Sequence, residues 1–237
     1  MTVAEKLTKI AENEPKVYNA GKQEYYDKFW NAFQYGGRRT MYNYAFIQGG
    51  WTTELLKPKY TVKAQQANYM FYANPIPNLD LSDPIYDFSK CILFSQWICN
   101  SLIVKVPKID ASKVSQGCYY MFNNATKLET IVELVLPATT AMTYGQATRN
   151  TFQNCTSLKN ITITGTIANT GFDLHWSTNL TIESLTSILT ALSKDSSIAA
   201  GKSITLPLAA QDKINANTTA KAQYDSAIAA GWTIAFS

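Results

Sequence analysis

The chain has 237 residues, a formal net charge of +4, 46% hydrophobic residues and only 16% charged residues. A folded chain of this length hides roughly 70–75% of its unfolded surface, which excludes a disordered protein. The charge that is missing is replaced by Thr, Asn and Ser, which favour strands and turns over long exposed helices. No apolar run approaches the roughly 20 residues needed to cross a bilayer, so we expect no membrane span.

The amino terminus carries charged residues among its apolar positions, at Glu5, Lys6 and Lys9. It has no small-residue cleavage site, so we expect no signal peptide and synthesis in the cytoplasm. Whether the protein then associates with a virion or a cell surface is left open. Its basic residues are spread along the chain, whereas nucleic-acid binders concentrate them in a stripe. We therefore expect no nucleic-acid partner.

The first 37 residues have the pattern of two helices. Residues 2–5 form a capping box that begins a helix ending near Asn13, and Pro15 begins the second helix. The second helix carries an aromatic stripe at helical spacing, made of Tyr25, Phe29, Trp30 and Phe33. We expect residues 1–37 to form a helical cap and to be the candidate surface for oligomerisation.

The following part of the chain repeats at intervals of 23, 28 and 30 residues, measured between phenylalanines at Phe71, Phe94, Phe122 and Phe152. Each phenylalanine is followed by a polar corner and then by apolar residues of a short strand. One such strand cannot bury its apolar side alone, so stacked copies must share a core. This period is typical of leucine-rich solenoids. We expect the repeats over residues 38–175, most clearly over 68–170.

The carboxy-terminal residues 176–237 have a different pattern. Thr181 is the expected N-cap of a helix with an apolar face, and residues 203–208 alternate as a strand does. Residues 211–230 predict a second helix, and residues 232–236 alternate again. The order helix, strand, helix, strand predicts a closing α/β cap.

Two stretches resemble the BspA-type leucine-rich repeat. Residues 109–114 (IDASKV) lead into 120–124 (YMFNN) and Leu128, and residues 151–161 (TFQNCTSLKNI) show the pattern again. The resemblance implies an α/β fold in which a right-handed leucine-rich-repeat solenoid carries parallel strands on one face. It also implies a role in attachment or recognition.

Both ends of the chain, at residues 4–18 and 230–233, resemble repeat proteins encoded in gut Firmicutes and their prophages. Such relatives are often labelled phage minor structural or tail-associated proteins. The resemblance implies a protein or glycan partner on a cell or virion surface.

The sequence gives little support for catalysis. Its single histidine, His175, has no nucleophile motif around it. The four cysteines contain no C-x-x-C pair, so we expect buried free thiols and no metal site. We predict no catalytic, cofactor-binding or metal-ligating residues. The alternative is a hydrolase that uses a cysteine, Cys118 or Cys155, or a site centred on His175.

Strand alternation predicts which residues a binding face would show. If the side chains of Leu79, Leu81, Leu102, Val104, Val106, Ile161 and Ile163 point inward, the opposite face shows Asp80, Ser82, Ile103, Lys105, Asn160, Thr162 and Thr164. Short polar groups on a stiff sheet can accept a glycan or a protein loop. A plain solvated sheet face is the alternative.

Taken together, the sequence predicts a non-catalytic module for recognition or assembly, which binds a protein or glycan on a bacterial surface or in a phage tail. A purely structural subunit that oligomerises through its amino-terminal helices is a further alternative, beside the hydrolase.

Overall fold

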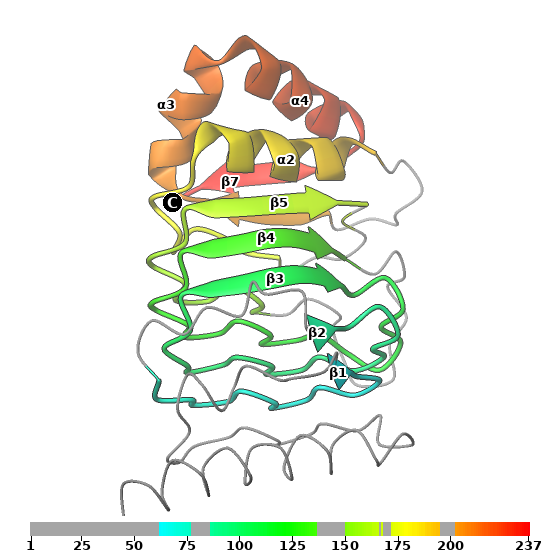
Figure 1. Cartoon of the computed structure of the whole chain (residues 1–237). Helices are drawn as coiled ribbons and strands as arrows, with labels where there is room; N and C mark the ends of the chain where they lie inside the picture. Colours follow the sequence, from blue (N-terminus) through cyan, green and yellow to red (C-terminus); the bar gives the residue numbers. More distant parts are fainter. Residues whose placement is uncertain (1–61, 77–85, 137–149, 166, 168–171, 195–201) are drawn as a thin grey trace, which may run out of the picture.

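The computed structural model describes residues 62–76, 86–136, 150–165, 167, 172–194 and 202–237. From β1 to β5 and then α2, the described elements follow one another from bottom to top of Figure 1. Helices α3 and α4 lie at the top, while β7 lies lower, near β5 and α2 in this view. In chain order they are β1 (Val62–Lys63), β2 (Tyr86–Asp87), β3 (Lys105–Asp110), β4 (Thr130–Val135), β5 (Asn160–Thr164), α2 (Ile182–Ser193), β6 (Ser203–Leu206), α3 (Leu208–Ala216), α4 (Thr218–Ala229) and β7 (Thr233–Phe236).

The prediction of a right-handed leucine-rich-repeat solenoid is wrong. The described residues form a mixed α/β fold with short, separate parallel sheets of two, three and two strands, ordered β1-β2, β3-β4-β5 and β6-β7. A repeating phenylalanine fixes a buried position in each segment but not the length of the strand beside it. The pairing of β1 with β2 spans only Val62 to Tyr86 and Lys63 to Asp87. The one broad sheet that the prediction needs is therefore missing from the described part of the chain.

Several sequence predictions fall on residues that the structure does not describe. The amino-terminal helical cap at 1–37 lies outside the described residues, and so do Leu79 and Leu81. The domain boundaries drawn at residues 37 and 175 stay predictions.

The turn segments that precede the strands lie side by side and are joined by backbone hydrogen bonds. The amides of Phe71, Ile98 and Phe122 donate to the carbonyls of Trp97, Met121 and Thr151, at 2.8, 3.0 and 3.0 Å. Each bond joins residues that are more than twenty positions apart in the chain. Neighbouring segments are thus held in register where the chain forms neither helix nor strand.

Each of these turns contains residues in the left-handed region of backbone conformation. The second such residue is an asparagine in three turns: Asn100, Asn124 and Asn154 have φ angles of 58°, 55° and 60°. Asparagine tolerates this conformation better than most residues with a side chain. The side-chain Nδ2 of Asn154 donates to Asn124 Oδ1 at 2.6 Å, and the side-chain Nδ2 of Asn124 donates to Asn100 Oδ1 at 2.9 Å. Side chains therefore join the same turns that the backbone joins.

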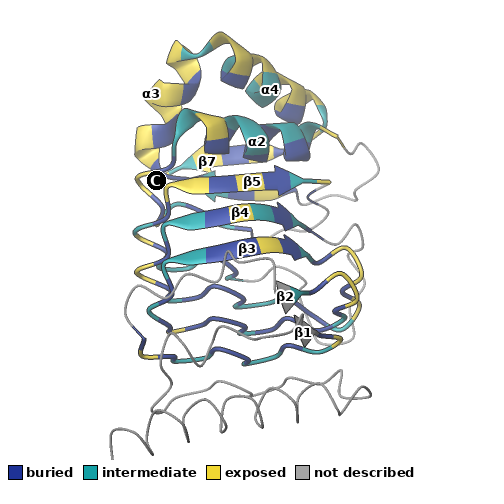
Figure 2. Cartoon of the chain, in the orientation of Figure 1, coloured by how far each residue is buried: buried dark blue, intermediate teal, exposed yellow. Residues whose placement is uncertain are grey.

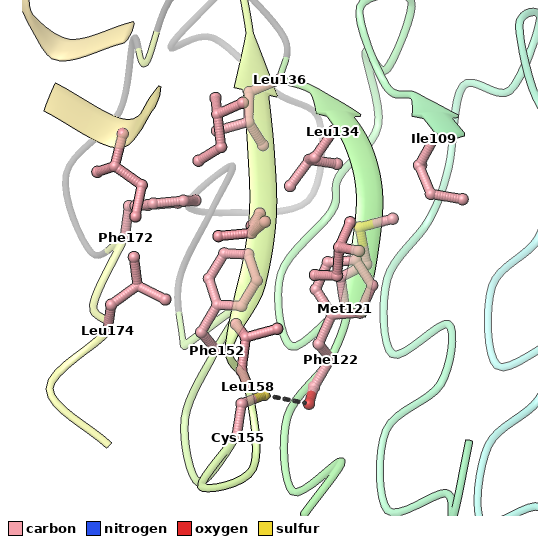
Figure 3. Close-up of a cluster of buried hydrophobic side chains, with 14 of the residues drawn as sticks. Ile109, Met121, Phe122, Leu134, Leu136, Phe152, Cys155, Leu158, Phe172 and Leu174 are labelled. Carbon is pink, nitrogen blue, oxygen red and sulfur yellow. Dashed lines mark hydrogen bonds between the residues drawn. The ribbon is translucent and has the colours of Figure 1, made fainter. Parts of the chain in front are cut away.

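Aromatic rings fill the space enclosed by these segments. Phe71, Phe94, Phe122 and Phe152 are all fully buried and belong to one core, which confirms that the repeating phenylalanines share an interior. The ring of Trp97 lies 5.8, 5.7 and 6.2 Å from those of Phe71, Phe94 and Phe122. Figure 3 shows Phe122, Phe152 and Phe172 side by side, each contributed by a different segment.

The edge of the three-stranded sheet is closed by α2. Thr181 caps this helix as predicted, because its side chain accepts a hydrogen bond from the Ser184 amide. Ser184 Oγ accepts from the Ile161 amide at 2.9 Å and donates to the Lys159 carbonyl at 3.0 Å. Ser187, one turn later, bonds in the same way to the amide and the carbonyl of Ile163, at 2.7 and 3.0 Å. The hydroxyls of α2 thus take the place of a further strand beside β5.

The carboxy-terminal elements agree with the predicted order except at one point. The helix predicted over residues 211–230 is two helices, α3 and α4, which meet at Asn217. Asn217 takes an extended conformation, and its side chain accepts a hydrogen bond from the Ala220 amide at 2.9 Å. An asparagine that caps the second helix in this way ends the first. In Figure 2 the exposed residues of α3 and α4 lie on their outer sides.

We expect the double substitution Ser184→Ala and Ser187→Ala to destabilise the protein. It leaves the amides of Ile161 and Ile163 without acceptors, and each unsatisfied buried donor costs about 1–3 kcal/mol. Urea denaturation should therefore show a loss of roughly 2–6 kcal/mol in the free energy of unfolding.

The control is the double variant Thr186→Ala and Thr190→Ala, whose hydroxyls donate to carbonyls of α2 itself at 2.8 Å each. It should lose less than about 1 kcal/mol. Equal losses in the two double variants would contradict the role assigned to the serines.

Candidate binding face

The structure brings four of the seven predicted site residues to the three-stranded sheet. Lys105 begins β3, while Asn160, Thr162 and Thr164 lie along β5. Asn160 and Thr162 are exposed, and Lys105 and Thr164 are half-buried. Two further predicted residues, Asp80 and Ser82, lie outside the described residues.

The prediction that Ile103 lies on the exposed face is wrong. Its side chain is fully buried, whereas Leu102 and Val104, predicted to point inward, are half-buried. The cause is that β3 begins only at Lys105, so the alternation of the strand does not extend back to Ile103. Ile103 and Val106 are three positions apart and both buried, which two residues of one alternating strand would not be.

An irregularity between β4 and β5 shapes the centre of the face. Ile131 pairs with Ile161 and Leu134 with Ile163, so β4 has one more residue than β5 between the paired positions. An extra residue of this kind forms a bulge, which re-aims the side chains beside it. The bulge places the exposed Val132, with 44% of its surface accessible, next to Glu133.

Glu133 joins all three strands of the sheet. It lies opposite Lys108 in the register of β3 and β4, and the Lys108 ammonium donates to its Oε1 at 2.9 Å. The Thr164 hydroxyl of β5 donates to the same oxygen at 2.7 Å. The Lys108 bond, with the Thr164 bond as second cause, holds the pKa of the Glu133 carboxyl below its ordinary value, while burial acts in the opposite direction. The carboxylate is thus fixed as a charged acceptor.

Further polar pairs lie where the strands begin. The Lys159 ammonium is 3.3 Å from the Glu129 carboxylate, and the side-chain Nδ2 of Asn160 donates to Thr130 Oγ1 at 3.4 Å. Lys108 and Glu133 belong to the face as well, although alternation from the sequence missed them. Their opposite charges stand 25 positions apart, which is the offset of the β3–β4 register.

The predicted free, buried thiols are confirmed: Cys91, Cys99, Cys118 and Cys155 are all buried and unbridged. Burial raises the pKa of Cys91 and Cys118 to about 12, that of Cys99 to about 11, and that of Cys155 as well. The Cys155 thiol donates to the Phe122 carbonyl at 3.1 Å, the bond drawn in Figure 3. A thiol attacks as its thiolate, which these surroundings disfavour.

His175 pairs with a carboxylate near it in the chain. Its Nδ1 lies 2.7 Å from Oδ1 of Asp173, and its ring lies against that of Trp176. The structure therefore gives His175 an acidic partner that orients the imidazole.

No group of three or more His, Cys, Asp or Glu residues suited to hold a metal ion occurs among the described residues. In that same part of the chain, no helix is both long and apolar enough to cross a membrane. Comparisons with protein-family models, with curated proteins and with solved structures find no match to this chain.

The titration of Glu133 tests the geometry of the face. A carboxyl whose pKa is lower in the folded than in the unfolded state adds stability above the unfolded value of about 4.3, and this stability is lost as the pH falls through the folded pKa. We expect Glu133→Gln to lower the free energy of unfolding at pH 7 by up to about 1 kcal/mol, with the difference vanishing in acid.

The matched variant is Lys108→Met, which removes the main cause of the shift. Carboxyl NMR should show the Glu133 midpoint rising toward about 4.3 in this variant. A midpoint that is the same with and without Lys108 would contradict the assigned interaction.

Proposed function

We propose that the protein is a non-catalytic recognition or assembly module, which binds a protein or glycan partner through the exposed face of β3, β4 and β5. The observation that supports this proposal most is the fixed arrangement of Lys108 and Thr164 on Glu133, with the exposed Val132 beside it in β4. An apolar centre with a polar surround is the usual anatomy of a protein interface.

The rigidity of the face favours binding. Its strands are paired on both sides of β4, and α2 closes the edge of β5. Groups that are already ordered lose little conformational entropy when a partner binds, so more of the contact energy becomes affinity. Donors and acceptors of short side chains such as Asn160, Thr162 and Thr164 suit the hydroxyls of a glycan or the backbone of a protein loop.

The proposed partner lies on a bacterial cell surface or in a phage tail, because residues 4–18 and 230–233 resemble the ends of repeat proteins of gut Firmicutes and their prophages. A role as a purely structural subunit depends on the helices predicted at 1–37, outside the described residues, and it stays a prediction. A hydrolase is the less supported alternative, because the four thiols are buried with raised pKa values.

Arrays of printed glycans and of surface peptides test the proposal when probed with labelled protein. Thr162→Arg places a long charged side chain at an exposed position of β5 and should weaken binding by about tenfold or more, since a blocked interface centre removes the dominant contacts. The matched control is Thr233→Arg, because Thr233 is also an exposed threonine and lies on a strand of another sheet, β7.

Binding that survives Thr162→Arg undiminished would rule out the sheet face as the site. Loss of binding in both variants would show a general effect of added charge and would also count against the proposal.

A further inference from the structure

A second group of accessible side chains lies in the chain between β5 and α2. Its members are Asp173, His175 and Trp176, here called the Trp176 platform. Trp176 has 39% of its surface accessible, whereas Trp97 and Trp232 are buried at 0% and 3%. The side chains of His175 and Asp173 are partly accessible too, at 28% and 36%.

The residues next to the platform side chains are hydrogen-bonded to other parts of the chain. The neighbouring residues Leu174 and Ser177 are buried, and the Leu174 amide donates to the Thr205 carbonyl of β6 at 2.9 Å. The Ser177 hydroxyl donates to the Cys155 carbonyl at 3.1 Å. His175 and Trp176 thus stand between two anchored positions, which makes the platform part of the folded body.

The side chains of the platform also fix one another. The ring centroids of His175 and Trp176 are 4.4 Å apart, with the planes tilted by 42°. Asp173 Oδ1 accepts from the His175 backbone amide at 3.3 Å and pairs with His175 Nδ1 at 2.7 Å. The Trp176 indole therefore lies against the His175 imidazole, and the Asp173 carboxylate fixes the orientation of that imidazole.

This arrangement leaves two acceptors beside an apolar ring. Both contacts of the Asp173 carboxylate within the described residues use Oδ1, so Oδ2 remains for a ligand. When the imidazole is neutral and Nδ1 donates to the carboxylate, Nε2 is an acceptor. A matching ligand carries hydroxyl donors next to an apolar face.

A pyranose ring has this combination, because its axial C–H groups form an apolar face and its hydroxyls donate around the rim. Stacking on an exposed indole uses the face, while Asp173 and His175 accept from the hydroxyls. The carboxylate disfavours an anionic ligand such as a nucleotide or a phosphosugar. We propose that the Trp176 platform is a binding site for a neutral saccharide, independent of the site on the sheet face.

The probes are cellohexaose, maltohexaose, mannohexaose and chitohexaose, each titrated to about 10 mM into the full chain. The readout is the indole N–H resonance of Trp176 in ¹⁵N-labelled protein, with the buried Trp97 as an internal reference. At least one saccharide should shift the Trp176 resonance saturably while leaving that of Trp97 in place.

Variants then assign the site, with calorimetry as the readout. Trp176→Ala should weaken binding of that saccharide by about tenfold or more, and Asp173→Ala should weaken it as well. Thr162→Arg, which blocks the sheet face, should change the affinity by less than about twofold, and this separates the platform from the proposed function. Circular dichroism of each variant checks that it folds.

A panel in which no saccharide shifts the Trp176 resonance would overturn the proposal. The same holds for binding that a folded Trp176→Ala variant retains in full, and for binding that Thr162→Arg abolishes while Trp176→Ala leaves it intact.

Discussion

The structure depends on parallel backbone hydrogen bonds between segments that are more than twenty residues apart in the chain. They join β3 to β4 and β4 to β5, and similar bonds join the turns at Phe71, Ile98 and Phe122 to their neighbouring segments. Each turn contains residues in the left-handed region of backbone conformation, and its amides and carbonyls form hydrogen bonds with those of the next segment. The rings of Phe71, Trp97, Phe94, Phe122, Phe152 and Phe172 then close the interior that these segments enclose.

A ladder of this kind presents free amides and carbonyls at its last member, and such an edge invites uncontrolled pairing. Here Ser184 and Ser187 of α2 bond to the backbone of β5 in place of another strand. The hydroxyls are three positions apart, so one face of the helix reaches both amides. The β5 edge of the sheet is thus closed by a helix of the same chain.

How much of this was predictable from the sequence depends on how local each signal is. Thr181 and the apolar face that follows it predicted α2, because cap and periodicity lie within one segment. The break at Asn217 was missed although asparagine is a common cap, since the helical pattern continues on both sides. The phenylalanine spacing predicted a shared core but not how far the strands extend, and the solenoid inferred from it was wrong.

The candidate face shows the same limit. Ile103 was assigned to the wrong side because alternation was extrapolated past the start of β3 at Lys105. The pairing of Lys108 with Glu133 depends on the register of β3 and β4, which no pattern within either strand encodes. The bulge at Val132 is likewise visible only when β4 is aligned with β5.

Amide hydrogen exchange measured by NMR tests the central claim most directly. The amides of Phe71, Ile98 and Phe122 lie in turns, yet they donate to neighbouring segments at 2.8–3.0 Å. The account predicts that they exchange only when the whole protein unfolds, with protection equal to the free energy of unfolding from denaturation. Rapid exchange at these turn amides, with the strand amides of β3 to β5 still protected, would contradict it.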